Sequence, residues 1–145
     1  AYRARMLLRV ADEYESVSDE VRAALKMIHR MRHNGMNLSK EGETELLSLH
    51  DACARLAEMV TEAFRLGKSA APDVLANMHA AADVISQRIK EIRAAQLKRL
   101  TDHHPQAEPI KIVLLMDLLN VYRRLKEDCL NIGDAMLDER AGDNP

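Results

Sequence analysis

Residues 2–35 read YRARMLLRVADEYESVSDEVRAALKMIHRMRHNG and decide the fold class of the chain. Their apolar residues recur at steps of three and four, which is the spacing of one face of an α-helix. The members of this stripe are Leu7, Val10, Tyr14, Val17, Val21, Leu25, Ile28 and Met31. Asn34-Gly35 follows, and glycine readily adopts the left-handed conformation that ends helices. The stretch therefore predicts a long helix from Tyr2 to His33 that packs against other helices.

Three later segments repeat this helical spacing. Residues 39–66 begin with Ser39 as a predicted N-cap, residues 72–100 open with Pro72, and Pro109 can lead a last helix. Their stripes are Leu46, Leu49, Cys53, Leu56, Val60 and Phe64; then Leu75, Met78, Ala82, Ile85, Ile89 and Ile92; then Leu114 or Leu115, Leu118, Val121, Leu125, Cys129, Ile132 and Met136. The pattern predicts four helices of similar length.

The composition agrees with an all-α protein. Only five glycines and four prolines occur among 145 residues, which is too few for a turn-rich β fold. Short connections make neighbouring helices antiparallel. We therefore expect residues 1–145 to form one domain, an antiparallel up-down bundle of four long helices. The main alternative is a three-helix core with one helix splayed away or swapped into a second subunit.

Charge and cysteine usage exclude several classes of function. The net charge of −2 offers no basic field for nucleic acid or an anionic membrane. Cys53 and Cys129 lie in apolar periodic segments, which favours two buried thiols over a disulfide or a metal pair. No apolar run approaches the roughly 20 residues that span a bilayer. The chain begins in a helical pattern at Ala1, which we expect of a fragment of a longer protein.

Acidic residues cluster in two of the predicted helices. The first cluster is Asp12, Glu13, Glu15, Asp19 and Glu20, and the second is Glu127, Asp128, Asp134, Asp138 and Glu139. An antiparallel bundle places the start of the first helix beside the end of the last, so the clusters can face each other. Clustered carboxylates repel unless they are solvated, protonated, paired with bases or bridged by a cation. An exposed polar face and an oxygen-rich cation site are both open at this point.

Histidines do not suggest an enzyme. Ferritin-type iron sites need Glu-x-x-His, but Lys26, Leu47 and Ala76 stand three residues before His29, His50 and His79. His50 and His79 have no phosphotransfer motif around them, and the chain has no glycine-rich phosphate loop or Cys-x-x-Cys pair. We expect a protein without catalytic residues.

Two short segments resemble each other and a known family. Tyr14 to Val21 aligns with Tyr122 to Cys129, and both look like the repeated helix of PhoU-like domains. Asn131 to Asp134 resembles the Asn-Ile-Ala-Glu continuation of that family. The junction Leu38 to Gly42 resembles the cytoplasmic PhoU-like tail of bacterial sodium/phosphate cotransporter family proteins.

The resemblance implies a site as well as a fold. Family members hold metal clusters with Glu-x-x-x-Asp motifs, which Glu15 and Asp19 match; the last helix departs from the motif, with Arg123 for the first acid and Glu127 for the aspartate. A divalent or iron cation between the first and last helices would use Glu15, Asp19, Glu127, Asn131 and Asp134. Alternatively, Arg123 would neutralise a carboxylate of the first helix in place of the metal.

The resemblance also implies a role. The chain would be a non-enzymatic regulatory domain of a sodium-dependent phosphate transporter, on the cytoplasmic face of the bacterial inner membrane. Its partners would be the transmembrane part of its own chain and further copies of itself, without nucleic acid and without direct insertion into the bilayer. The alternative function is a stand-alone metal-binding bundle or one that self-associates through its broad apolar stripes.

Overall fold

The computed structural model describes residues 2–67, 73–103 and 109–142, with side chains for 3–67, 73–99 and 110–136. These residues form four helices and no strand: α1 (Tyr2–His33), α2 (Lys40–Leu66), α3 (Val74–His103) and α4 (Pro109–Gly142). The prediction of an all-α protein with four long helices is confirmed. The proposed start of the third helix at Pro72 lies outside the described residues, and that helix continues past Leu100 to His103.

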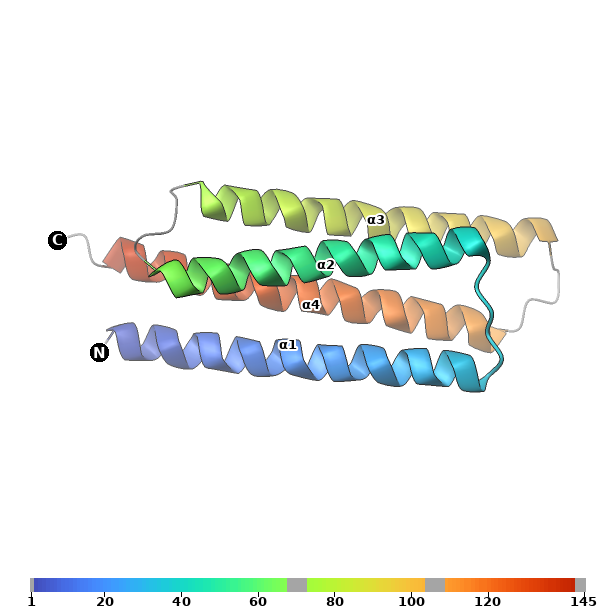
Figure 1. The fold of residues 1–145 in the computed structure, drawn as a ribbon, viewed down its shortest axis with the longest axis horizontal. Coiled ribbons are helices and arrows are strands. Elements are labelled where there is room, and N and C mark those ends of the chain that lie inside the picture. Colours follow the sequence, from blue (N-terminus) through green and yellow to red (C-terminus); the bar gives the residue numbers. More distant parts are fainter. Residues whose placement is uncertain (1, 68–72, 104–108, 143–145) are drawn as a thin grey trace.

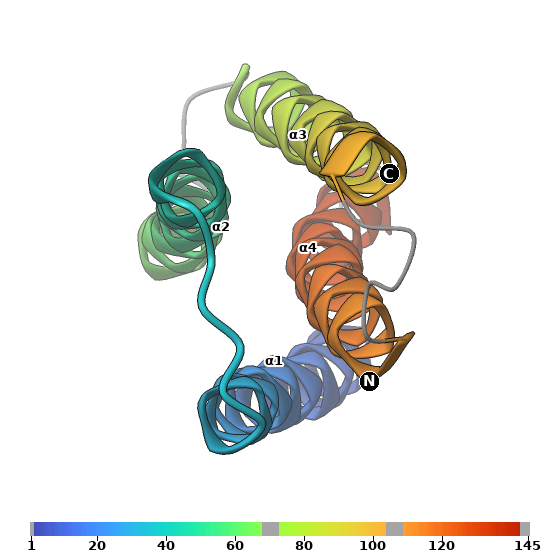
Figure 2. The ribbon, with the colours of Figure 1, turned by 90° about the vertical axis from the view of Figure 1, so that its right-hand side faces the viewer.

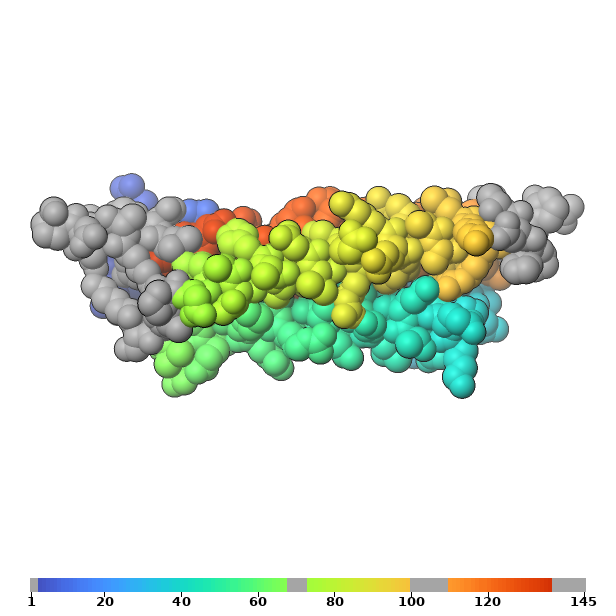
Figure 3. Space-filling view, turned by 90° about the horizontal axis from the view of Figure 1, so that it is seen from above, coloured from blue at the N-terminus to red at the C-terminus, as the bar shows by residue number. Residues whose placement is uncertain are grey.

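The four helices lie alongside one another, and consecutive helices run in opposite directions (Figure 1). They do not contribute equally to the bundle. The helices α2, α3 and α4 each pack against the other two, whereas α1 packs chiefly along α4. Viewed along its length, the molecule has α1 beside α4 and farther from α2 (Figure 2). Seen from above the view of Figure 1, α3 lies alongside α2 (Figure 3).

The deepest part of the core belongs to three helices. The largest fully buried side chains are Leu49, Leu56, Val60, Met78, Ile85, Leu118, Leu119, Cys129 and Ile132. All of them come from α2, α3 and α4, and none comes from α1. α2, α3 and α4 thus form a three-helix core, to which α1, packed along α4, adds Met6, Val10 and Met31.

The apolar stripe predicted for the first helix is only partly its packing face. Leu7, Val21 and Leu25 were expected to pack, but they are 44%, 45% and 64% exposed. The residues of α1 that are buried are Met6, Val10 and Met31. The correction has a geometric cause: residues at three- and four-residue steps drift around a straight helix of 3.6 residues per turn, so one long stripe covers two faces. One of these faces meets α4 and the other looks toward α2.

The connection from α1 to α2 is fixed by two caps that the sequence predicts. Gly35 takes a φ of 62°, its N–H donates to the Arg32 carbonyl at 3.0 Å, and the Met36 N–H donates to the Met31 carbonyl at 3.0 Å. This pair of bonds is a Schellman C-cap. Ser39 caps α2, accepting a hydrogen bond from the backbone N–H of Gly42 at 3.1 Å. The predicted end and start are confirmed.

The state of the two cysteines and the hydropathy of the helices complete the description of the fold. Cys53 and Cys129 are both free and buried, as predicted. Burial raises the pKa of Cys53 to about 12 and that of Cys129 to about 11. Within the described part of the chain, no helix has a segment long and apolar enough to cross a membrane.

Candidate functional site

Polar side chains meet in the middle of the contact between α1 and α4. This α1–α4 seam consists of Glu13 and Glu20 from α1 and Arg124, Asp128 and Asn131 from α4. The Arg124 Nε donates to Oε1 of Glu20 at 2.8 Å, and the Glu20 side chain is only 17% exposed. The other oxygen of Glu20, Oε2, is buried without a hydrogen-bond partner. A charge-assisted hydrogen bond therefore holds one buried carboxylate at the seam.

The rest of the seam is rich in carboxylates. Asn131 Nδ2 donates to Oε2 of Glu13 at 3.2 Å. Burial, and next the charges of Glu13, Glu20 and Glu127, raise the pKa of Asp128 to about 6, although Arg124 opposes the rise. Asp128 thus lies near three other carboxylates, two of them from α1, and near the guanidinium of Arg124. The consequence is a contact between helices that weakens when Asp128 loses its proton.

The residues predicted to hold a metal do not converge. Glu15 is exposed, and Asp19 lies 3.4 Å from Arg22 of its own helix. Glu127 pairs with Arg123. Among the described residues, no group of three or more His, Cys, Asp and Glu side chains is arranged to hold a metal ion. The structure therefore places the two halves of the Glu-x-x-x-Asp motif on the outer surface of α1.

The last two candidates have separate partners. Asn131 is bound to Glu13 of the seam, while Asp134 lies 3.4 Å from Nε2 of His79 on α3. The side chains of Asp138 and Glu139, which belong to the predicted acidic stretch, lie outside the described residues. The candidates from α4 thus face two different helices.

The expected ion pair across the first and last helices exists, but a different arginine forms it. Arg123 was expected to neutralise a carboxylate of α1; instead its Nη1 binds Oε1 of Glu127, four residues along the same helix, at 2.9 Å. Arg124 is the residue that reaches α1. Because adjacent residues of a helix point about 100° apart, Arg124 shares the α1-facing side with Asp128 and Asn131, and Arg123 points outward with Glu127.

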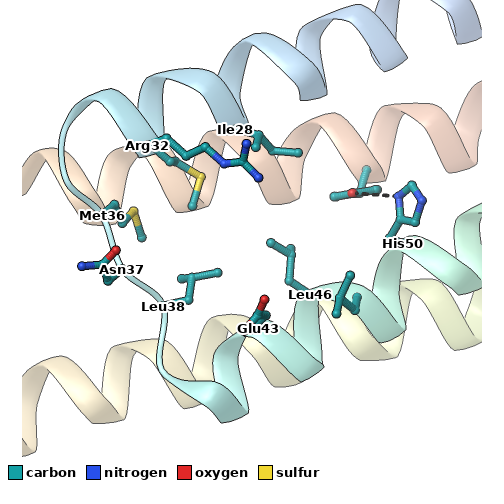
Figure 4. Close-up of a pocket in the computed structure, with 11 residues that line it drawn as sticks. Ile28, Arg32, Met36, Asn37, Leu38, Glu43, Leu46 and His50 are labelled. Atoms are coloured by element: carbon teal, nitrogen blue, oxygen red, sulfur yellow. Dashed lines mark hydrogen bonds between the residues drawn. The ribbon is translucent and has the colours of Figure 1, made fainter.

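A second site, which the sequence did not predict, lies between α1 and α2. This α1–α2 groove has a volume of about 510 Å³. Its walls are mainly apolar, and polar groups from both helices reach it (Figure 4). The residues that line it are Ile28, Met31, Arg32, Met36, Asn37, Leu38, Glu43, Leu46, Leu47, His50 and Tyr122. A concave apolar surface with a few convergent polar groups is the usual form of a binding site.

The α1–α2 connection bounds the groove at one end, and a contact of Tyr14 with α2 lies toward the other end. The Schellman cap of α1 sends the connecting segment across one end, where Met36 and Leu38 line the groove. Toward the other end, the Tyr14 hydroxyl donates to Oγ1 of Thr61 at 3.1 Å, and its ring meets Phe64 edge-on. The helices α1 and α2 are thus joined at Tyr14 and separated along the groove.

The floor of the groove has its own polar contact. His50 Nδ1 lies 3.2 Å from the hydroxyl of Tyr122 on α4, and the two rings meet edge-on. Burial raises the pKa of Tyr122 to about 12, so the hydroxyl keeps its proton. One feature of the sequence indicated this site: α1 has more apolar residues than a single helix-packing face can bury.

Comparison of the chain with protein-family models, with curated proteins and with solved structures finds no match.

Proposed function

We propose that this chain is a non-enzymatic regulatory domain of the PhoU-like type, arranged as an antiparallel up-down bundle. We further propose that it forms the part of a sodium-dependent phosphate transporter on the cytoplasmic face of the bacterial inner membrane. The observation that carries the proposal is the pairing of α1 with α4. These are the two helices whose segments, Tyr14 to Val21 and Tyr122 to Cys129, resemble the repeated helix of that family. They lie along each other and bring Glu20 and Arg124 into contact.

The α1–α2 groove adds support for an interaction role. A regulatory domain needs a surface that binds another protein element, and this groove presents apolar side chains beside unlike charges. A metal is not required by the proposal, since Arg124 supplies positive charge between α1 and α4.

Sodium-driven uptake of labelled phosphate by vesicles that contain the full-length parent protein tests the proposal. We expect the parent reading frame to encode several apolar spans of about 20 residues ahead of Ala1. We expect uptake to require sodium, and removal of residues 1–145 to change its rate. A parent protein without such spans, or uptake that is indifferent to removal of the domain, would contradict the proposal.

A further inference from the structure

The face of α1 that is turned toward α2 carries apolar side chains that the rest of the chain leaves partly exposed to solvent. Tyr14, Val21 and Ile28 are seven residues apart, so they share this face, and Tyr14 contacts α2. Leu25 is seven residues before Arg32, which lines the groove, so the two side chains share one side of α1. On the opposite side of the groove, Leu47 is 57% exposed. Both walls therefore present large apolar side chains to water, which is costly unless a partner covers them.

The shape of this surface favours an elongated occupant. A compact molecule of the groove's volume, about 510 Å³, would contact the lining residues. It would leave Val21 and Leu25 uncovered, because they lie along α1 beyond the groove lining and are 45% and 64% exposed. A helix laid between α1 and α2 covers the groove and these side chains together, with its own apolar residues three, four and seven apart as anchors.

The charges on the two walls specify the occupant further. Arg32 lines the groove from α1, and Glu43 lines it from α2 (Figure 4). A helix that lies in the groove meets the guanidinium of Arg32 on one flank and the carboxylate of Glu43 on the other, and complementary charges there fix its orientation.

We infer that the α1–α2 groove is the docking site for an amphipathic helix of a partner protein, one with a carboxylate on the flank that meets Arg32 of α1 and a base on the flank that meets Glu43 of α2. The inference rests on the groove itself and not on phosphate transport. A failure of the uptake experiment would leave it standing, and the binding experiment below does not involve the transporter.

The test uses the full chain and a designed probe. The probe is a fluorescein-labelled peptide of about 20 residues with a leucine stripe at helical spacing, glutamates on one flank and lysines on the other. Fluorescence anisotropy measures its Kd. We expect binding in the micromolar range, and about tenfold weaker binding for each of Leu25→Ser and Leu47→Ser, because each removes a leucine from the buried contact.

Three further variants distinguish binding in the groove from nonspecific binding to exposed apolar side chains. Leu8 is 68% exposed and lies on a different side of α1 from Leu25, so Leu8→Ser should leave the Kd unchanged. Arg32→Glu should weaken binding several-fold, because both walls then carry negative charge. Adding Glu43→Arg to Arg32→Glu should restore binding, with the peptide lying in the opposite direction. Circular dichroism confirms that each variant remains helical.

Four results would overturn the inference. The first is no binding at 100 µM peptide, and the second is equal weakening by Leu8→Ser and Leu25→Ser. The third is displacement of the peptide by dodecanoate at matching concentrations, which would identify a compact anionic amphiphile as the occupant. The fourth is a dimer in sedimentation that Leu25→Ser dissociates, which would identify a second copy of this chain.

Discussion

The two faces of α1 differ in how far their side chains are buried. Toward α4, the helix places Glu20 against Arg124, and its side chains Met6 and Val10 are buried in the core. Toward α2, it leaves Val21 and Leu25 largely exposed. The first face is a closed contact with charges inside it, and the second is an open groove with apolar side chains at its edges. α1 therefore packs onto the bundle through one face and is available for binding through the other.

The largest expected effect separates the three-helix core from the groove. Leu118 is fully buried, so Leu118→Ala should lower the free energy of unfolding by about 2–5 kcal/mol through lost burial and the cavity left behind. Leu25→Ala removes the same atoms from a side chain that is 64% exposed and should change the free energy by about 0.5 kcal/mol or less. Urea denaturation followed by circular dichroism measures both. Equal losses would show that Leu25 is buried in solution.

The next effect tests whether charge fastens α1 to α4. Arg124→Ala leaves the Glu20 carboxylate without its partner in a site where it is 17% exposed, and should cost about 1–2 kcal/mol of stability. Arg123→Ala is the matched control, because its partner Glu127 is on the same exposed helix face; the expected loss is about 0.3–0.5 kcal/mol. A greater loss for Arg123→Ala in thermal melting would refute the assignment of Arg124 as the residue that joins the helices.

A smaller effect concerns pH. The pKa of Asp128 is about 6 in the folded protein, above its ordinary value of 3.8, so between these two values the folded state holds a proton that the unfolded state has released. The contribution of Asp128 to the stability of the folded state therefore falls as pH rises from about 4 to 6, and the fall is complete above pH 6. Asp128→Asn should raise stability at pH 7 by about 1 kcal/mol, since the partly exposed site is screened by solvent.

Comparing unfolding of the two proteins at pH 5 and pH 7 isolates this contribution. The difference between Asp128→Asn and the unaltered chain should be smaller at pH 5. A difference that is the same at both pH values would mean that Asp128 has an ordinary pKa.

The smallest expected effect concerns the hydrogen bond between Tyr14 of α1 and Thr61 of α2. Tyr14→Phe removes the hydroxyl that donates to Thr61 while keeping the ring against Phe64, and should cost about 0.5 kcal/mol. Hydrogen exchange of backbone amides in the middle of α1 should rise slightly, with α3 unchanged as the internal control. A loss as large as that of Arg124→Ala would mean that α2, and not α4, holds α1 in place.

Helix positions in this chain follow from local signals, whereas the site does not. Gly35 and Ser39 mark the end of α1 and the start of α2 by chemistry that depends on a few neighbouring residues. The choice of Arg124 over Arg123 depends on the rotation of α4 about its axis, which tertiary packing sets. The exposure of Leu25 depends on how far α2 stands from α1, and no local pattern encodes that distance.

The two buried cysteine thiols can report on opening of the core. Cys53 of α2 and Cys129 of α4 are buried in the three-helix core, and their raised pKa values keep them protonated at neutral pH. A thiol-reactive dye modifies the thiolate form, and only when the site becomes accessible. We expect the α2–α3–α4 packing to persist when α1 alone detaches, so the rate of labelling should report opening of that core. The chain therefore carries a native reporter that distinguishes detachment of one helix from unfolding of the whole domain.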